Sequence, residues 1–166
     1  MSVNIALLTV TDTRTLETDK SGNILVEKIK NSNHNLVDRK ICKDNKEDIK
    51  TVLKEWTNKK ELDVIITTGG TGLTGRDITP EALNEIADKH IPGFGEIFRY
   101  LSLETVGTSS IQSRACAVLS NGKYVFALPG SSGGVTDAWD KILIHQLDVN
   151  HKPCNFVELF PRLKEK

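Results

Sequence analysis

The stretch DVIITTGGTGLTGRD, residues 63–77, carries the signals that decide the fold of this chain. Residues 64–68 are apolar or β-branched, as in a strand that is buried on both faces of a sheet. Four glycines follow, at positions 69, 70, 72 and 75. Glycine permits positive φ and lets backbone N–H groups approach a ligand closely. Thr79 as N-cap and Pro80 as first helical residue then begin a helix. A buried strand, a glycine loop and a capped helix in this order predict a phosphate-binding loop.

Two other interpretations of the loop stay open. Residues 70–75, GTGLTG, match the G-x-G-x-x-G pattern of dinucleotide-binding proteins, in which the third glycine already lies in the helix. Here Pro80 places the helix start several residues later, which favours an accidental match. The Walker A pattern needs Gly-Lys-Ser/Thr, whereas this loop ends Gly75-Arg76-Asp77. The second alternative is a surface turn without a ligand, but ordering four glycines has an entropy cost that a plain connection has no reason to bear.

The composition is that of an ordinary globular protein. We expect one domain, residues 1–166, in which residues 150–166 form an extended C-terminal tail without regular structure. The chain is 38% hydrophobic and 27% charged, and its formal net charge is zero, which gives no reason to expect a nucleic-acid or membrane partner. The apolar N-terminal stretch lacks a basic region and is too short to span a bilayer. We therefore expect a cytoplasmic protein.

The cysteines and histidines do not form a recognisable metal or disulfide pattern. The three cysteines, at positions 42, 116 and 154, are odd in number and far apart, which predicts reduced structural thiols. The four histidines, at positions 34, 90, 145 and 151, show no HxxxH or HExxH spacing. We therefore expect each histidine to have a surface or core role rather than to bind a metal.

Strands and helices alternate on both sides of the glycine loop. The predicted strands are residues 5–10, 36–42, 64–68, 115–119 and 123–128, and the predicted helices are residues 23–30, 48–57, 80–89, 96–103, 109–114 and 135–147. The initial βαβαβ order predicts an α/β fold, with a mostly parallel sheet and helices on both of its faces. Asn121-Gly122 is a type I′ turn signal, so the last two strands should add an antiparallel hairpin.

Ligands of such sheets bind where the carboxyl ends of the strands meet. That edge collects Thr11-Asp12, residues 42–44 and the glycine loop, so Asp44 and Asp77 could face one site. From spacing alone, Asp44 is better explained as the N-cap of the next helix, with Glu47 three residues later, than as a catalytic acid. Residues 128–134, LPGSSGG, form a second loop of small residues after a strand and are a second candidate for ligand contact.

Several motifs in sequence order resemble the MoaB/MogA family of molybdenum cofactor biosynthesis, and the match covers nearly the whole chain. The motifs are TTGGTG (67–72), RD (76–77), TPEA (79–82), PGFGE (92–96), QSRA (112–115) and LPG (128–130). The opening TVTDTR and the late KPCNF (152–156) are most similar to the MoaB branch. The resemblance implies a three-layer α/β/α sandwich and a homo-oligomer built from trimers, often a hexamer.

The resemblance also implies an activity, which is the adenylylation of molybdopterin with Mg²⁺-ATP and release of pyrophosphate. It places the functional acids at Asp77 and Asp44, which we expect to hold Mg²⁺ and orient phosphate, although Lys43-Asp44-Asn45 replaces the family's Pro-Asp-Asp/Glu. Arg76 either stabilises developing charge or pairs with Asp77. The expected phosphate-binding residues are Thr68, Gly69, Gly70, Thr71 and Gly72, and the candidates for the pterin phosphate side are Ser21, Ser113, Pro129 and Gly130.

Two other functional classes stay open at this point. A non-catalytic protein that carries molybdopterin, or acts as a scaffold in the same pathway, would keep the loop without transferring AMP. A nicotinamide-dependent enzyme would bind NAD, which the position of the helix start argues against. Other enzymes of molybdenum cofactor synthesis are further partners that the resemblance implies.

Overall fold

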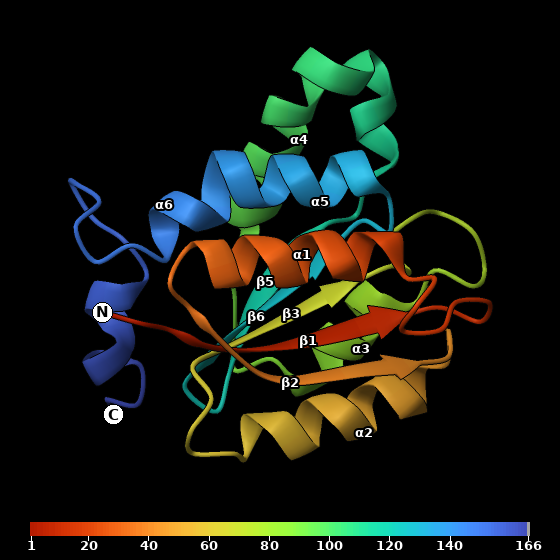
Figure 1. Ribbon diagram of the computed structural model, residues 1–166. Helices are drawn as coiled ribbons and strands as arrows, with labels where there is room; N and C mark the ends of the chain where they lie inside the picture. The colour runs from red at the N-terminus through yellow and green to blue at the C-terminus, as the bar shows by residue number, and fades with distance from the viewer. Residues whose placement is uncertain (166) are drawn as a thin grey trace.

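A computed structural model describes residues 1–165 of the chain and shows a six-stranded sheet between two layers of helices (Figure 1). The strand order is β2-β1-β3-β6-β5-β4. The strands are β1 (Asn4–Val10), β2 (Asn35–Cys42), β3 (Val64–Thr68), β4 (Lys89–His90), β5 (Cys116–Ser120) and β6 (Lys123–Leu128). The first three strands and β6 run parallel, whereas β5 pairs antiparallel with β6 and with β4. The predicted α/β/α class and its antiparallel hairpin are confirmed.

Alternation along the strands creates the two hydrophobic cores on which the helices pack. In β1, Ile5 and Leu7 face one core, and Ala6 and Leu8 face the other, as the period of two in a strand requires. The first core is covered by α1 (Lys20–Asn31), α4 (Pro92–Val106) and α5 (Ser132–Ala138), and the second by α2 (Lys46–Thr57) and α3 (Thr79–Ile86).

The order of the strands reverses at β1. From β1 the chain crosses to β2 at the edge of the sheet, and then returns across β1 to form β3 on its other side. A reversal of this kind opens a crevice at the carboxyl ends of the two inner strands, because the loops that leave them diverge toward opposite faces. The glycine loop follows β3 and therefore begins at this crevice.

Two predicted helix starts are wrong, and the reason lies in the side chains beside them. Asn45, not Asp44, is the N-cap of α2, because its amide oxygen accepts from Glu47 N at 2.9 Å. Thr79 is the first residue of α3 rather than its cap, since its hydroxyl donates back to the carbonyl of Gly69 at 2.8 Å. The carboxylate of Asp44 is thus free of a capping role.

Several other boundaries differ from the prediction. Helix α1 begins three residues early because Asp19 accepts from Gly22 N, and α3 ends at Ile86, so that β4 can pair at the sheet edge. The predicted helices 96–103 and 109–114 are a longer α4 and the 3₁₀ helix η1 (Gly107–Gln112). The predicted helix 135–147 is α5, a π-helical turn η2 (Trp139–Leu143) and α6 (Ile144–Gln146).

The C-terminal segment contains regular structure, which contradicts the prediction for residues 150–166. The 3₁₀ helix η3 (Val157–Arg162) forms because aromatic residues anchor the segment to β6: the rings of Tyr124 and Phe156 lie 4.6 Å apart. Lys166 lies outside the described residues. The hairpin turn is confirmed, since Asn121 and Gly122 have φ of 49° and 71°, as type I′ requires. Within residues 1–165, no helix combines the length and the apolar character that a bilayer crossing demands.

Candidate functional site

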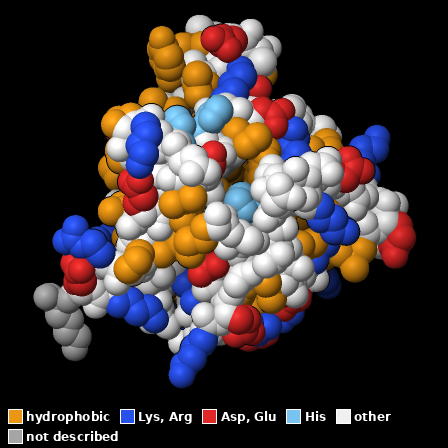
Figure 2. Space-filling model, turned by 60° about the vertical axis from the view of Figure 1, so that its left-hand side comes forward, with side chains coloured by type: hydrophobic (Ala, Val, Ile, Leu, Met, Phe, Trp, Pro, Cys, Tyr) orange, Lys and Arg blue, Asp and Glu red, His pale blue; other side chains and the backbone are white. Residues whose placement is uncertain are grey.

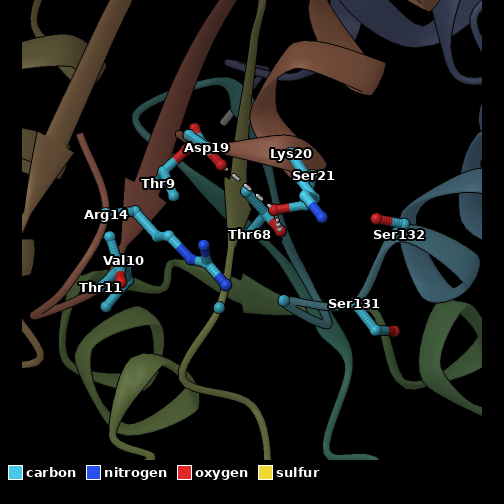
Figure 3. Close-up of a pocket in the computed structure, with 12 residues that line it drawn as sticks. Thr9, Val10, Thr11, Arg14, Asp19, Lys20, Ser21, Thr68, Ser131 and Ser132 are labelled. Carbon is cyan, nitrogen blue, oxygen red and sulfur yellow. Dashed lines mark hydrogen bonds between the residues drawn. The ribbon is translucent and has the colours of Figure 1, made fainter. Parts of the chain in front are cut away.

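A cavity of about 290 Å³ lies at the crevice, between the carboxyl ends of β1 and β3 and the first turns of α1 and α5 (Figure 3). Its lining combines hydroxyl groups, glycines and two cations, which is a suitable set for a phosphate group. The residues that line it are Thr9, Val10, Thr11, Arg14, Asp19, Lys20, Ser21, Thr68, Gly69, Gly130, Ser131 and Ser132.

A buried carboxylate organises one wall of this cavity. Asp19 is 1% exposed and accepts hydrogen bonds from the hydroxyl of Thr9 at 2.6 Å, from Gly22 N at 2.9 Å and from Arg39 Nη2 at 3.0 Å. Burial alone would raise the pKa of Asp19, but these hydrogen bonds and the charge of Arg39 hold it below its ordinary value. Asp19 therefore remains ionised and keeps the first turn of α1, with Ser21, at the cavity.

The cation that enters the cavity is Arg14. In Figure 3 its side chain extends from the segment after β1 into the space between Thr68 and Val10. Opposite it, the Thr68 hydroxyl donates to the carbonyl of Pro129 at 2.8 Å and lies 3.3 Å from the hydroxyl of Ser21, which ties β3 to the loop after β6 and to the start of α1. The cavity thus presents the Arg14 guanidinium together with hydroxyls, such as those of Thr9 and Thr68, that hydrogen bonds already position.

The glycine loop can follow its path only because two of its residues lack a Cβ. Gly69 has φ of +103°, and a Cβ there would collide with the carbonyl oxygen of Val10. Gly70 has φ of +67°, and a Cβ there would collide with the hydroxyl oxygen of Thr79. Other residues adopt such φ values only with strain. The loop therefore turns sharply between the cavity and α3, while Gly69 N donates to the carbonyl of Leu128 at 3.0 Å.

The two predicted acids lie together beside this turn. A Cβ on Gly70 would stand 3.4 Å from Asp44 Oδ1, and one on Gly72 would stand 2.8 Å from Asp77 Oδ2. Partial burial, followed by the negative charge of Asp77, raises the pKa of Asp44, so the two carboxylates interact. Although partial burial acts in the opposite direction, hydrogen bonds from the hydroxyl and amide of Thr74 lower the pKa of Asp77.

Arg76 does not pair with Asp77, as one of its two predicted roles required. Its guanidinium forms an ion pair with Asp12, in the segment after β1. The second oxygen of the Asp12 carboxylate accepts from Asp44 N at 3.2 Å. Asp77 accepts instead from Thr74 in its own loop.

The predicted site residues lie at three neighbouring places: the cavity described above, an adjacent cavity, and the glycine loop beside the two acids. Ser21, Thr68, Gly69 and Gly130 line the cavity described above. Ser113 and Pro129 line an adjacent cavity of about 660 Å³ between α4, η1 and α5, which shares Ser131 and Ser132 with the first. Gly70 and Gly72 lie against the acids, and Thr71 is buried, with its carbonyl accepting from Arg114 N.

The sequence reasoning missed several residues of the site. These are Thr9, Arg14, Asp19 and Lys20, which line the cavity, and Arg114, which holds the glycine loop, whereas Thr11, Ser131 and Ser132 lie in segments that were expected at the site. The available signal was position: Thr9 lies near the end of the first strand, and Arg14, Asp19 and Lys20 lie between that strand and the predicted helix 23–30.

The acid pair fits a magnesium ion by its chemistry. Mg²⁺ takes oxygen ligands, and commonly one or two carboxylates together with phosphate oxygens and water. Asp44 and Asp77 supply two such carboxylates, and their mutual repulsion is what a cation would relieve. No group of three or more acidic, histidine or cysteine side chains suited to a metal occurs among the described residues, so phosphate oxygens would have to complete the coordination.

A comparison with protein families finds that residues 6–149 match the model described as "Probable molybdopterin binding domain". The chain belongs to this family. The match spans the cavity, the acid pair and the loops after β1, β3 and β6, so the whole candidate site lies within the family domain.

Relatives in the family are similar over almost their full length. The chain is 43% identical over 161 residues to molybdenum cofactor biosynthesis protein B of Escherichia coli K12, covering 97% of this chain and 93% of that protein. It is 44% identical over 146 residues to the protein of the same name from Bacillus cereus, covering 87% and 86%. These relatives place the chain in the MoaB/MogA family.

Solved structures show that the family fold is shared in detail. A crystal structure of molybdenum cofactor biosynthesis protein B matches with a TM-score of 0.90 at 40% identity, covering 100% of this chain and 98% of the other. The tungsten cofactor synthesizing protein MoaB of Pyrococcus furiosus matches with a TM-score of 0.77 at 35% identity, covering 86% and 91%.

Proposed function

We propose that this protein transfers AMP from Mg²⁺-ATP to the terminal phosphate of molybdopterin and releases pyrophosphate. The observation that carries the proposal is the placement of a hydroxyl-lined cavity on one side of Gly69-Gly70 and a pair of carboxylates on the other. A reaction between two phosphates needs a binding place for each of them, and the two places must lie close together: here the cavity and, with a cation on the two carboxylates, the acid pair. The sharp turn of the glycine loop separates these two places by one peptide.

Each part of the site has a role in this reaction. Ser21, Thr68 and Arg14 hold the pterin phosphate in the cavity, and the carboxylates of Asp44 and Asp77 would hold Mg²⁺ beside Gly70, where the triphosphate binds. An oxygen of the pterin phosphate attacks the α-phosphorus, a new P–O bond forms, and the bond to the β-phosphate oxygen breaks, so that both electrons leave with pyrophosphate. Such a transfer depends on positioning and charge neutralisation and needs no covalent enzyme intermediate. A bound Mg²⁺ would neutralise phosphate charge.

The test is to incubate the protein with molybdopterin, Mg²⁺ and ATP and to measure adenylylated pterin and pyrophosphate. Asp77→Asn should reduce the transfer rate by about 10²–10³-fold while the chain stays folded, by analogy with removal of one preorganised electrostatic group. Asp44→Asn should have a smaller effect and should not weaken the cap of α2, which Asn45 forms. Asp140→Asn is the control, because Asp140 pairs with Lys28 on the helix layer. Wild-type turnover in Asp77→Asn would contradict the assignment.

A non-catalytic carrier of molybdopterin is the second candidate. The observation that favours it is that Asp77 already accepts from the Thr74 amide at 2.9 Å and hydroxyl at 2.6 Å, which closes the loop without any ligand. A carrier would bind molybdopterin through the cavity but would produce no pyrophosphate. Equilibrium dialysis with molybdopterin, in parallel with the transfer assay, separates the two functions.

We also propose that copies of the chain associate through α4 and η1, as a trimer or a hexamer. Five of the eleven exposed large hydrophobic side chains in the described part of the chain lie there: Ile97, Tyr100, Leu103, Val106 and Ile111. Helix α4 extends away from the sheet in Figure 1, and hydrophobic side chains gather at this end in Figure 2. Exposed apolar faces of this kind mark interaction sites. Tyr100→Lys with Ile111→Lys should lower the mass measured by sedimentation, and an unchanged mass would contradict this interface.

A further inference from the structure

Arg114 contacts the glycine loop at both of its ends. Its Nε donates to the carbonyl of Gly72 at 2.7 Å, and its Nη2 donates to the carbonyl of Asp77 at 2.5 Å. Its backbone N–H donates to the carbonyl of Thr71 at 2.9 Å. One residue from the segment between η1 and β5 therefore holds the start and the end of residues 72–77.

Apart from the ion pair of Arg76 with Asp12, the loop has little other support on its outer side. Leu73 is 67% exposed and the Arg76 side chain is 73% exposed. A Cβ on Gly75 would meet no atom within 4 Å. The bonds from Thr74 to Asp77 close the loop on itself, but they do not fix its orientation toward Asp44 or the cavity. The contacts of Arg114 connect the loop to the hairpin of β5 and β6, which is part of the sheet.

The direction of the guanidinium is set by Glu81. Nη1 pairs with Glu81 Oε1, and Nη2 donates to Glu81 Oε2 at 3.3 Å, from the first turn of α3. A planar guanidinium held by a carboxylate presents its remaining N–H groups in fixed directions. Here those directions point to the two loop carbonyls. A lysine at this position would have a single ammonium group, which cannot occupy all of these places at once.

We propose that Arg114, oriented by Glu81, is a positioning residue that holds residues 72–77 so that the Asp77 carboxylate faces Asp44. The role of Arg114 in AMP transfer rests on the proposed function, whereas its role in holding residues 72–77 does not. The Asp77 carboxylate lies directly over Gly72, so the peptide that Arg114 holds is also the one on which that carboxylate rests. Release of this peptide would move the acid and leave the cavity unchanged.

The first measurement follows the loop itself and needs no activity. In Arg114→Gln and Arg114→Lys, hydrogen exchange at the amides of residues 72–77 should become faster than in the wild type, while exchange in β1 and β3 stays the same. Arg99→Gln is a matched control, because within residues 1–165 Arg99 donates to the carbonyls of Ser113 and Ala115 and not to residues 72–77. Unchanged exchange at residues 72–77 in both Arg114 variants would overturn the proposal.

The second measurement separates positioning from a general loss of structure. The turnover number for AMP transfer should fall by about 10²-fold in Arg114→Gln, since a displacement of about 1 Å can have that effect, whereas the KM for molybdopterin should not change. Glu81→Gln should show a smaller decrease in the same direction. In Arg114→Ala, added guanidinium ion should restore part of the turnover, which a merely structural loss would not allow. A wild-type turnover number in Arg114→Gln, or a raised KM for molybdopterin without a lower turnover number, would overturn the proposal.

The two proposals fail in different ways. If the wild-type protein transfers no AMP, the proposed function is wrong, and the hydrogen-exchange result alone decides whether Arg114 positions the loop. If the wild type is active and Arg114→Gln exchanges normally at residues 72–77, the function stands and the positioning proposal is wrong. Where Arg114→Gln does not fold, Arg114→Lys and Glu81→Gln decide the question by the same measurements.

Discussion

Replacing Asp19 by alanine should destabilise the protein strongly, because this one carboxylate connects three elements. Asp19 caps α1 through Gly22 N, accepts from Thr9 on β1 and pairs with Arg39 on β2. Its side chain is 2% exposed and that of Arg39 is 18% exposed. The Nε of Arg39 is buried and already has no hydrogen-bond partner within the described residues. Once the Asp19 carboxylate is removed, the Arg39 guanidinium therefore has to move out of its buried position to find another hydrogen-bond acceptor.

The expected magnitude follows from two losses. Removing an N-cap side chain costs about 1 kcal/mol. Breaking a buried ion pair by removing one partner costs about 3–5 kcal/mol, because the other charge remains buried. Arg39 can relieve part of this by moving its partly exposed end toward solvent, so we expect about 4 kcal/mol in all. That is a large part of the ~5–15 kcal/mol by which folded domains are stable. Asp19→Asn keeps a capping side chain and should lose less.

Urea unfolding followed by the fluorescence of the two buried tryptophans, Trp56 and Trp139, measures the effect. With a slope of about 2 kcal/mol per M, a loss of 4 kcal/mol lowers the midpoint by about 2 M. The double variant with Arg39→Met should lose less than the sum of the two single variants, since no unpaired charge is then left. A loss below about 1 kcal/mol in Asp19→Ala, with an unchanged slope, would refute this account of the wall of the cavity.

The same carboxylate gives a pH dependence with a definite sign. The pKa of Asp19 in the folded chain lies below its ordinary value of 3.8. Its contribution is therefore fully present above about pH 4 and is lost as the pH falls through the folded-state pKa. The free energy of unfolding of the wild type should fall more steeply below pH 4 than that of Asp19→Asn. Parallel curves for the two proteins would contradict the lowered pKa.

Two further predictions test the glycine loop and the thiols. Gly69→Ala should weaken molybdopterin binding and lower stability by more than 1 kcal/mol, since its φ of +103° and the Val10 carbonyl leave no place for a Cβ. Gly75→Ala is the matched control: a Cβ there meets open space, so molybdopterin binding and stability should not change. Equal losses in the two variants, measured by dialysis and by urea unfolding, would contradict the reasoning. With a thiol reagent at pH 8, the exposed Cys154 should react at once. Burial, the largest cause in each case, raises the pKa of Cys42 to about 12 and that of Cys116 to about 11, so these two thiols should react more slowly. Three equally fast thiols would contradict this burial.

Part of the candidate site was predictable because it depends on local chain chemistry. The apolar residues 64–68 predicted a central strand, and the glycines after it predicted a turn with positive φ, which Gly69 and Gly70 show. The acids Asp44 and Asp77 were both expected at one sheet edge, because parallel strands bring their carboxyl ends together. The capping role of Asp44 was wrong, because two neighbouring residues can each cap and local pattern cannot choose between them.

The sequence by itself determined the order of the five longer strands and of the helices between them, the alternation that builds two cores, and the turns at Gly69-Gly70 and Asn121-Gly122, but not the short strand β4 or the 3₁₀ helix η3. Each of these depends on residues close together in the chain, so a local pattern is enough. Only the tertiary structure decided that Arg39 would pair with Asp19, that Arg76 would pair with Asp12, and that Arg114 would hold the loop of Asp77. Charged side chains are long and many partners are chemically equivalent, so the choice among them is made by the packing of the sheet and not by their spacing in the sequence.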